Sequence, residues 1–362
     1  MRQAIPGFTG FVDVDGLFAL ARRGDAVARV VAEHPRRKRD RWELHTGPFL
    51  ELSRAHLPDS HWTLLVQGVE SLIPGGWELL RRFSFLPAAR IDDLMISYAA
   101  THGTVGPHED LYDVFLLQGA GRRRWQISAR GDHATIEGAP IKMLKHFVAE
   151  EEFILEPGDM LYLPPGVAHW GVALEPGFTY SIGFVAPSHE KLLQNFLAYL
   201  GQRLEQVIDP DAMYEDPDLT PTTRPLAIGG EMVRAVESLL ATHIHWERAL
   251  VEEFLGRLLT GPKPSVVFQP PERPLPPAAF GKRLRKSGTL RLALPSRGLV
   301  REDVAFLNGQ QLRVDTATLK TLEELFARRS IALPLALGAD ALSLVHQLYS
   351  SGYLELDQSV SR

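Results

Sequence analysis

The chain has 362 residues, 45% hydrophobic and 23% charged, which predicts two or three folded domains of roughly 100–200 residues each and excludes wholesale disorder. Its 39 basic and 44 acidic residues give a net charge of -5, which argues against a polyanion-binding surface over the whole chain and leaves room for a local basic patch. Cysteine is absent, which excludes disulfide scaffolds, iron–sulfur clusters, thiolate zinc sites and cysteine nucleophiles, so any metal must be bound by His, Asp or Glu.

The N-terminal segment lacks the continuous apolar run of a signal peptide, because Pro6, Asp13 and Asp15 interrupt it. No later stretch of about 18 uncharged apolar residues is long enough to span a membrane. We therefore expect a cytoplasmic protein with no membrane partner.

Short apolar runs separated by Gly and Pro follow from about residue 45 to residue 187. The clearest runs are residues 94–99, 114–118, 125–128 and 160–163. Spacing of about ten residues with turn residues between the runs is typical of an all-β sandwich or barrel. The run Gly119-Ala120-Gly121 predicts a three-residue hairpin turn between two of these strands.

The pattern becomes helical between residues 189 and 260. Apolar side chains recur at spacings of three and four in Leu192, Leu193, Phe196, Leu197, Leu200 and Leu204. Two further helices are expected at about 230–242 and 246–259. These stripes exceed what one small barrel needs to cover, so we expect a packing or dimerisation module that makes the protein a homodimer.

A proline-rich stretch at 262–278 predicts a linker. Beyond it come strand-like RLALPS and QQLRV, helices near 316–328 and 338–350, and a closing strand at 353–356, an order consistent with a winged helix. The second helix, ALSLVHQLYSSG, carries no Lys or Arg, so we expect protein contact and no direct DNA binding. The expected domains are a catalytic barrel at 1–188, dimerisation helices at 189–261, and a linker with the winged helix at 262–362.

Residues 105–115, VGPHEDLYDVF, hold the first candidate metal ligands. His108 and Asp110 lie two apart, so in a strand both side chains point to the same face. His169 follows a strand and a tight turn about sixty residues later and is the best third ligand. Two His and one carboxylate form the facial triad of non-haem Fe(II) oxygenases, which leaves positions open for a co-substrate and oxygen. The alternative is a pair of polar residues at a strand end plus a loop histidine.

A possible anion site lies in the strand at 122–128. Alternation places Arg123, Trp125 and Ile127 on one apolar face and Arg122, Arg124, Gln126 and Ser128 on the other. A buried guanidinium is costly without an anion, and a dicarboxylate co-substrate would supply one through a bidentate contact. The alternative is that the phase is off by one and the arginines form a solvated rim.

Four other polar residues are weaker candidates. Ser97 and Ser181 lie in apolar strands and would add hydroxyl donors to the co-substrate site, unless they are structural serines. Tyr112 is in phase with the candidate ligands His108 and Asp110 and would line a substrate pocket. Asp113 is out of phase, so it reaches a substrate guanidinium only if a bulge intervenes.

The runs GPHEDLYDVFLLQGAGRRRW and LEPGDMLYLPPGVAHWG together resemble the Jumonji-C oxygenases, specifically the bacterial ribosomal oxygenases that hydroxylate an arginine. The resemblance covers the whole chain. It implies a mainly β plus α fold: a double-stranded β-helix (cupin or jelly-roll) barrel, a helical dimerisation segment and a C-terminal winged helix. It also implies Fe(II) bound by His108, Asp110 and His169, with 2-oxoglutarate and O2 as co-substrates and Arg123 binding the 5-carboxylate of 2-oxoglutarate. The implied partner is a large-subunit ribosomal protein, the sixteenth, hydroxylated on an arginine.

Other functions remain open at this point. One alternative is a histidyl hydroxylase that acts on another ribosomal protein. A second is a metal-binding cupin without redox activity, which would bind metal and not consume 2-oxoglutarate. A third is a winged-helix regulator whose DNA binding would fall steeply with salt. Turnover of 2-oxoglutarate with Fe(II), with and without a ribosomal peptide, separates an oxygenase from the second and third alternatives.

Overall fold

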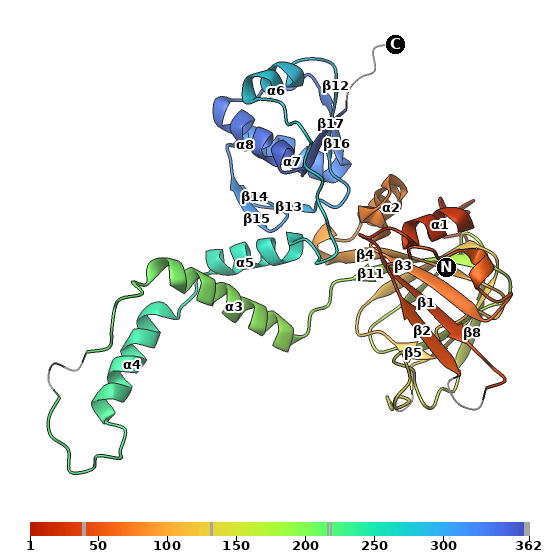
Figure 1. Cartoon of the computed structure of the whole chain (residues 1–362), viewed down its shortest axis with the longest axis horizontal. Helices are drawn as coiled ribbons and strands as arrows, with labels where there is room; N and C mark the ends of the chain where they lie inside the picture. Colours follow the sequence, from red (N-terminus) through yellow and green to blue (C-terminus); the bar gives the residue numbers. More distant parts are fainter. Residues whose placement is uncertain (38–40, 131–132, 216, 218, 358–362) are drawn as a thin grey trace.

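The computed structural model describes residues 1–37, 41–130, 133–215, 217 and 219–357. Two β-sheets form a barrel in the first half of the chain, three helices follow, and a smaller α/β module closes the chain (Figure 1). In Figure 1 helices α3 and α4 extend away from the barrel, whereas the last module lies above it. A mainly β barrel followed by helices and an α/β module confirms the predicted fold class.

The larger sheet is antiparallel, with seven strands in the order β2-β1-β3-β4-β11-β6-β9. Its strands are β1 (Val27–Glu33), β2 (Trp42–Thr46), β3 (Trp62–Gln67), β4 (Ile91–Ala99), β6 (Val114–Ala120), β9 (Met160–Leu163) and β11 (Gly177–Phe184). The smaller sheet has the order β5-β10-β7-β8 and comprises β5 (His108–Glu109), β7 (Arg123–Ser128), β8 (Glu151–Leu155) and β10 (Ala168–Ala173). From β4 to β7, and again from β8 to β11, consecutive strands alternate between the two sheets, as in a jelly roll.

The predicted hairpin at residues 119–121 is wrong. β6 continues through Gly119 and Ala120, where Ala120 pairs with Phe178 of β11 in the larger sheet. β7 belongs to the smaller sheet, so Gly121, with φ of 63°, turns the chain from one sheet to the other. Turn residues show that the chain reverses, but they do not show which strands pair afterwards.

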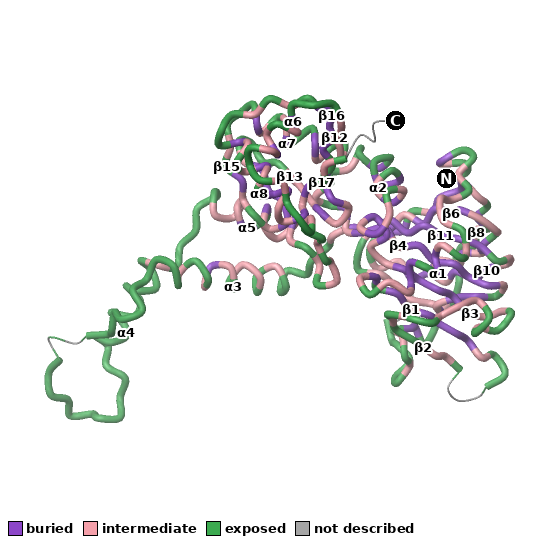
Figure 2. The backbone as a smooth tube through the Cα atoms, turned by 45° about the horizontal axis from the view of Figure 1, so that its top comes forward, coloured by how far each residue is buried: buried purple, intermediate pink, exposed green. Residues whose placement is uncertain are grey.

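Alternation along β4 and β11 separates an apolar face from a polar one. Leu94, Ile96 and Tyr180 point outward into the main core, which they share with helices α1 (Val14–Ala21) and α2 (Pro74–Leu80). Ser97 and Ser181 belong to the opposite, inward face and line a cavity. Figure 2 shows these central strands as the most continuously buried part of the barrel. The helices therefore cover the apolar side of the larger sheet, and its polar side faces the interior.

Four short 3-10 helices connect the strands: η1 (Arg54–His56), η2 (Val69–Ser71), η3 (Arg81–Phe83) and η4 (Ala88–Arg90).

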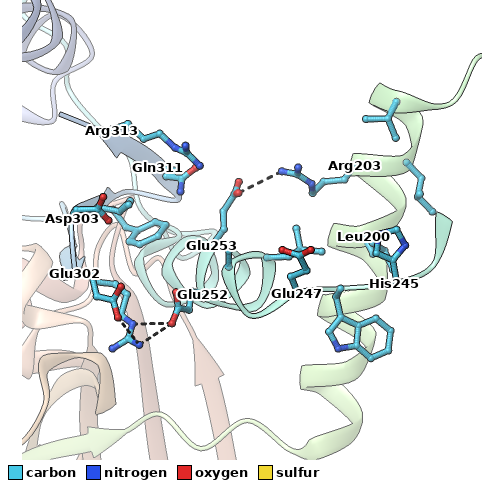
Figure 3. A pocket seen from close by; sticks show the side chains of 18 of the residues that line it. Leu200, Arg203, His245, Glu247, Glu252, Glu253, Glu302, Asp303, Gln311 and Arg313 are labelled. Atoms are coloured by element: carbon cyan, nitrogen blue, oxygen red, sulfur yellow. Dashed lines mark hydrogen bonds and ion pairs between the residues drawn. The ribbon is translucent and has the colours of Figure 1, made fainter. Parts of the chain in front are cut away.

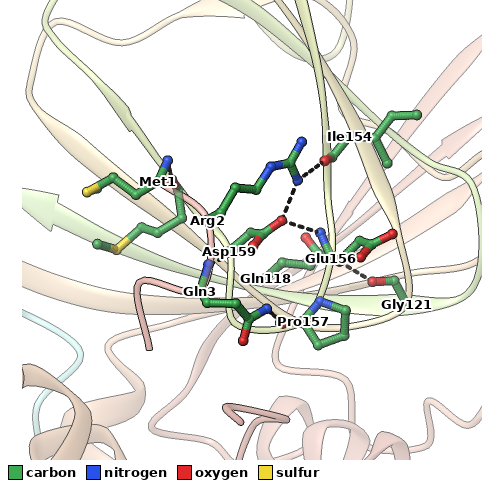
Figure 4. Close-up of polar contacts among 10 residues, drawn as sticks. Met1, Arg2, Gln3, Gln118, Gly121, Ile154, Glu156, Pro157 and Asp159 are labelled. Atoms are coloured by element: carbon green, nitrogen blue, oxygen red, sulfur yellow. Dashed lines mark hydrogen bonds and ion pairs between the residues drawn. The ribbon is translucent and has the colours of Figure 1, made fainter. Parts of the chain in front are cut away.

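The N-terminal residues close one end of the barrel through Asp159 (Figure 4). The Asp159 carboxylate accepts hydrogen bonds from the Arg2 side chain and from the backbone N–H of Gln3. Close to this network, the Gln118 side-chain amide donates to the carbonyls of Ala120 and Gly121. These bonds hold the chain where β6 leaves the larger sheet.

Three helices follow the barrel: α3 (His189–Val207), α4 (Gly230–His243) and α5 (Arg248–Thr260). Every residue of α4 belongs to the described part of the chain, and none of them is buried. On α3 only Leu200 is buried, whereas α5 buries Phe254, Gly256 and Thr260. Figure 2 shows α4 as exposed along its length.

The C-terminal module contains two three-stranded sheets, β16-β12-β17 and β13-β14-β15. Its elements are α6 (Pro277–Leu284), β12 (Gly288–Leu292), β13 (Gly298–Arg301), β14 (Val304–Leu307), β15 (Gln310–Arg313), α7 (Thr316–Arg328), β16 (Ser330–Leu333), α8 (Ala339–Ser350) and β17 (Leu354–Asp357). The predicted strand RLALPS ends earlier than expected, and α6, β13, β14 and β16 were not anticipated. The last five residues of the predicted module lie outside the described residues.

The C-terminal module packs directly against the barrel at α2. The Trp77 indole N–H donates to the carbonyl of Leu294 at 2.9 Å. The Arg329 guanidinium lies 4.1 Å above the Trp77 ring and donates to the carbonyls of Ala293 and Ser296.

Across the residues described, no helix combines the length and apolar character needed to cross a membrane.

Candidate active site

Three metal-ligating side chains meet in the barrel interior. Antiparallel pairing of β5 with β10 places His108 opposite His169, with ring centroids 4.2 Å apart. Asp110 follows β5 directly, and its Oδ2 lies 3.8 Å from Nε2 of His169. One ligand atom from each residue lies within 4.8 Å of the other two, so a single cation fits between them.

Hydrogen bonds orient both imidazoles toward this point. Nδ1 of His108 lies 3.0 Å from the carbonyl of Gly106, and Nδ1 of His169 lies 3.0 Å from the carbonyl of Val167. Because a carbonyl only accepts, each Nδ1 carries the proton and each Nε2 offers its lone pair. Burial lowers the pKa of His169 to about 3, and the charges of His108 and Arg123 act in the same direction. The His169 ring is therefore neutral at physiological pH, the form that binds metal.

A cavity of about 270 Å³ extends from the triad between the two sheets. Its walls come from β3, β4, β6 and β11 of the larger sheet and from β7 and β10 of the smaller one. The volume suits a small organic ligand together with one inserted side chain.

Arg123 lines the same cavity. It is only 4% exposed, and burial lowers the pKa of its guanidinium to about 10. The guanidinium donates to Thr179 Oγ1 and to the carbonyl of Gly171, both at 3.3 Å, and lies 4.9 Å from the Trp125 ring. Among the described residues it has no carboxylate partner, and its Nε has no acceptor. A buried cation without a counter-ion indicates an anionic ligand.

Two neighbours hold Arg123 in this position. A Cβ built on Gly171 would lie 2.8 Å from Nε of Arg123 and 2.6 Å from the Trp125 ring, so only glycine fits here. Thr179 also donates its hydroxyl hydrogen to Oε1 of Gln118 at 3.1 Å, which leaves the hydroxyl oxygen to accept from Arg123. The Gln118 contacts near the barrel end therefore extend to the cavity.

The strand phase predicted for β7 matches the structure at Arg123 and Trp125, which are both buried. Arg122 instead pairs with Glu175 at the surface, at 2.6 Å. Ser128, which alternation places on the opposite face, is also buried, and its hydroxyl donates to the carbonyl of Arg130.

The structure brings three of the four weaker candidates to the cavity. Ser97, Ser181 and Tyr112 line it, and both serines are buried. Asp113 does not belong to the lining residues. Its carboxylate instead accepts a 2.6 Å hydrogen bond from Tyr162 and pairs with Arg90. No bulge turns Asp113 inward, so it is not placed where a substrate in the cavity meets it.

Sequence analysis missed several lining residues. Asp92 and Asp93 at the start of β4 bring negative charge to the cavity wall, and Thr179 contacts Arg123. Alternation could have found two of them, because Asp93 is in phase with Ser97 and Thr179 is in phase with Ser181.

Comparisons with known proteins agree with this geometry. A JmjC domain family model matches residues 78–192, and a ROXA-like winged helix model matches residues 239–355. The ribosomal protein uL16 3-hydroxylase of Escherichia coli is 32% identical over 96% of this chain and 92% of its own length. A probable ribosomal oxygenase of Haemophilus influenzae is 34% identical over 60% of this chain and 51% of its own length.

Solved structures lead to the same group. The crystal structure of YcfD from Escherichia coli superposes with a TM-score of 0.83 at 30% identity and covers 99% of this chain and 94% of that one. A structure of the same ribosomal oxygenase in complex with cobalt and 2-oxoglutarate has a TM-score of 0.79 at 29% identity, with the same coverage of both chains.

Proposed function

We propose, from the premise that this chain belongs to the family of Jumonji-C ribosomal oxygenases, that it hydroxylates an arginine side chain of the large-subunit ribosomal protein uL16. The reaction would use Fe(II), 2-oxoglutarate and O2. One observation carries the proposal: the His108–Asp110–His169 triad and the unpaired Arg123 guanidinium line the same interior cavity. A metal site and a buried anion site in one small cavity fit a metal-chelating dicarboxylate.

The residues present fit the metal. His108, Asp110 and His169 would hold Fe(II), and both imidazoles are already oriented with Nε2 free. When bound, iron would activate O2, which is the oxidant, and 2-oxoglutarate would supply part of the electrons that reduce it, with the substrate supplying the rest. The chain contributes the ligand geometry and a buried site that keeps bulk water away.

Arg123 would bind the far carboxylate of 2-oxoglutarate. Its contacts with Thr179 and Gly171 fix the guanidinium before the ligand arrives, so little conformational entropy is lost on binding. Ser97 and Ser181 would add hydroxyl donors from the opposite wall of the cavity.

The charge of the cavity wall favours arginine as the target. Asp92 and Asp93 line the cavity on the β4 side, and Tyr112 adds an aromatic ring beside them. A guanidinium stays charged at every physiological pH, whereas a histidine is largely neutral, so this acidic wall discriminates between the two. A basic ribosomal protein also suits a chain with a net charge of -5. A ribosomal substrate would place the reaction in the cytoplasm.

The helical segment would make the enzyme a homodimer. Leu193 and Leu197 on α3 are 62% and 61% exposed, and the apolar side chains of α4 are uncovered too. A cleft of about 680 Å³ lies between α3, α5 and the β13–β15 sheet, where Leu200 and Arg203 face Glu253 and Arg313 (Figure 3). A second copy would cover these apolar faces, which a monomer leaves in water.

Mass spectrometry tests the proposed function. Peptides around uL16 arginines and peptides with ribosomal histidines are incubated with enzyme, Fe(II), O2 and 2-oxoglutarate. We expect one added oxygen atom on an arginine of uL16, absent without 2-oxoglutarate and absent with His169→Ala. Oxygen added only to a histidine would support the histidyl hydroxylase. Metal binding without consumption of 2-oxoglutarate would support a cupin without redox activity.

A further inference from the structure

Two cations from the C-terminal half of the chain contact the start of β4. Lys263 follows α5, and its Nζ lies 2.9 Å from Oδ1 of Asp92 and 3.8 Å from Oδ2 of Asp93. The Arg297 guanidinium, from the loop before β13, donates to the carbonyls of Ile91 and Asp92. The segment of the barrel wall that carries both carboxylates is therefore held by residues far away in sequence.

Asp93 lies between the contact with Lys263 and the active-site cavity. It shares the inward phase of β4 with Met95 and Ser97, and all three line the cavity. Its two oxygens point in different directions: Oδ2 faces Lys263, whereas Oδ1 lies 3.3 Å from the position of a Cβ built on Gly183, a residue that also lines the cavity. Lys263 itself lines a separate, smaller cavity of about 150 Å³ and is not among the residues that line the active-site cavity. Lys263 thus contacts the wall from behind and leaves the active-site side free.

We propose that Lys263 is a positioning residue for substrate specificity: by pairing with Asp92 and with Oδ2 of Asp93, it keeps the Asp93 carboxylate oriented and charged, so that Oδ1 is available to the cationic side chain of the substrate. The cation is the arginine of the proposed function, on which this inference rests. Lys263 does not line the active-site cavity, so it acts through the two carboxylates that do, Asp92 and above all Asp93. The C-terminal half of the chain thereby contributes to substrate selection without touching the substrate.

The electrostatic surroundings explain why Asp93 needs this partner. Burial raises the pKa of Asp93, and the negative charge of Asp92 adds to this, whereas Lys263, Arg297 and the backbone N–H of Gly68 lower it. Glu70, on η2, is a further buried carboxyl that interacts with Asp93. Without Lys263, the pKa of Asp93 would rise further, so the carboxylate would take up a proton at a higher pH. A neutral carboxyl attracts a guanidinium much less strongly than a carboxylate does.

The experiment compares Lys263→Met, which keeps the aliphatic stem, with Lys263→Arg, which keeps the charge. Lys282→Met serves as the matched control, because Lys282 is an exposed lysine on α6. Lys263 is partly exposed, so the missing charge acts through an intermediate dielectric, and we expect KM for the arginine peptide to rise roughly tenfold in Lys263→Met. KM for 2-oxoglutarate should not change. The acid limb of kcat/KM for the peptide should move to higher pH. Lys263→Arg should restore most of the peptide KM, and Lys282→Met should match the wild type.

The outcomes separate this inference from the proposed function. If the wild type hydroxylates the arginine peptide and Lys263→Met has the same KM for that peptide, the proposed role of Lys263 is wrong. A lower peptide KM overturns it too, because it would mean that Lys263 competes with the substrate. If the wild type does not hydroxylate arginine, the proposed function fails. NMR of ¹³C-labelled aspartate carboxyls then still tests whether Lys263 interacts with Asp93, because it measures the pKa of Asp93 directly. A higher Asp93 pKa in Lys263→Met supports the interaction, and an unchanged pKa refutes it.

Discussion

Replacing Arg123 with methionine tests the anion site most directly. The guanidinium is 4% exposed, its bonds go to Thr179 and Gly171, and no described carboxylate pairs with it. Removing one member of a buried charge pair costs about 2–5 kcal/mol, because the other charge stays buried and unpaired. The dissociation constant for 2-oxoglutarate should therefore rise roughly 30-fold to 5,000-fold. Anaerobic titration of the metal-loaded protein measures it without turnover.

The cofactor-free protein should respond in a different way. Burial has already lowered the pKa of Arg123 to about 10, which shows that the site disfavours the charge when no ligand is present. Methionine has a similar length and no charge to desolvate, so Arg123→Met should leave the melting temperature of the unliganded protein unchanged or higher. Loss of 2-oxoglutarate affinity without loss of stability is the expected combination.

Neighbouring arginines provide the control. Arg122 pairs with Glu175 at the surface, where ion pairs contribute little, so Arg122→Met should leave 2-oxoglutarate binding unchanged. Equal losses of affinity in Arg122→Met and Arg123→Met would refute the assignment of the anion site to Arg123. A large drop in the melting temperature of unliganded Arg123→Met would show that the side chain is structural.

Three further predictions concern the metal, the dimer and stability. Alanine in place of His169, or of either partner in the triad, should abolish 2-oxoglutarate turnover at saturating Fe(II) while the melting curve stays cooperative; full activity would remove that residue from the triad. Glutamate at both Leu193 and Leu197 should give a monomer by light scattering, whereas a wild type that is itself monomeric at micromolar concentration would refute the dimer. Burial, with the charge of Asp93, raises the pKa of Glu70 from 4.5 to about 7. Between these two pH values the folded protein retains a proton that the unfolded chain releases. The free energy of unfolding should therefore fall by about 3 kcal/mol as pH rises through this window. Urea unfolding at both ends of the window should show this loss in the wild type and not in Glu70→Gln.

Local pattern was enough to predict much of the site. His108 and Asp110 are close in sequence, so their relative direction follows from strand periodicity alone. The same periodicity placed Arg123 and Trp125 on the interior side of β7. It also indicated the serines, because a polar side chain within an apolar strand either packs in the core or lines a site.

Pairing between distant strands was beyond the reach of local pattern. The turn residues around Gly121 predicted a reversal of the chain, yet β6 and β7 enter different sheets. Asp113 lies in the motif itself, but Tyr162 and Arg90 hold it away from the cavity, and both contacts depend on folding.

The sequence by itself determined the donor types, their periodicity and the order of the elements, because these depend on bonded geometry and on side chains a few residues apart. Only the tertiary structure decided which of them share a site. The register of β5 against β10 sets His108 opposite His169, and the docking of the C-terminal half brings Lys263 to Asp93. Such contacts join residues far apart in the chain, and their formation depends on the packing of the whole molecule, which no local pattern encodes.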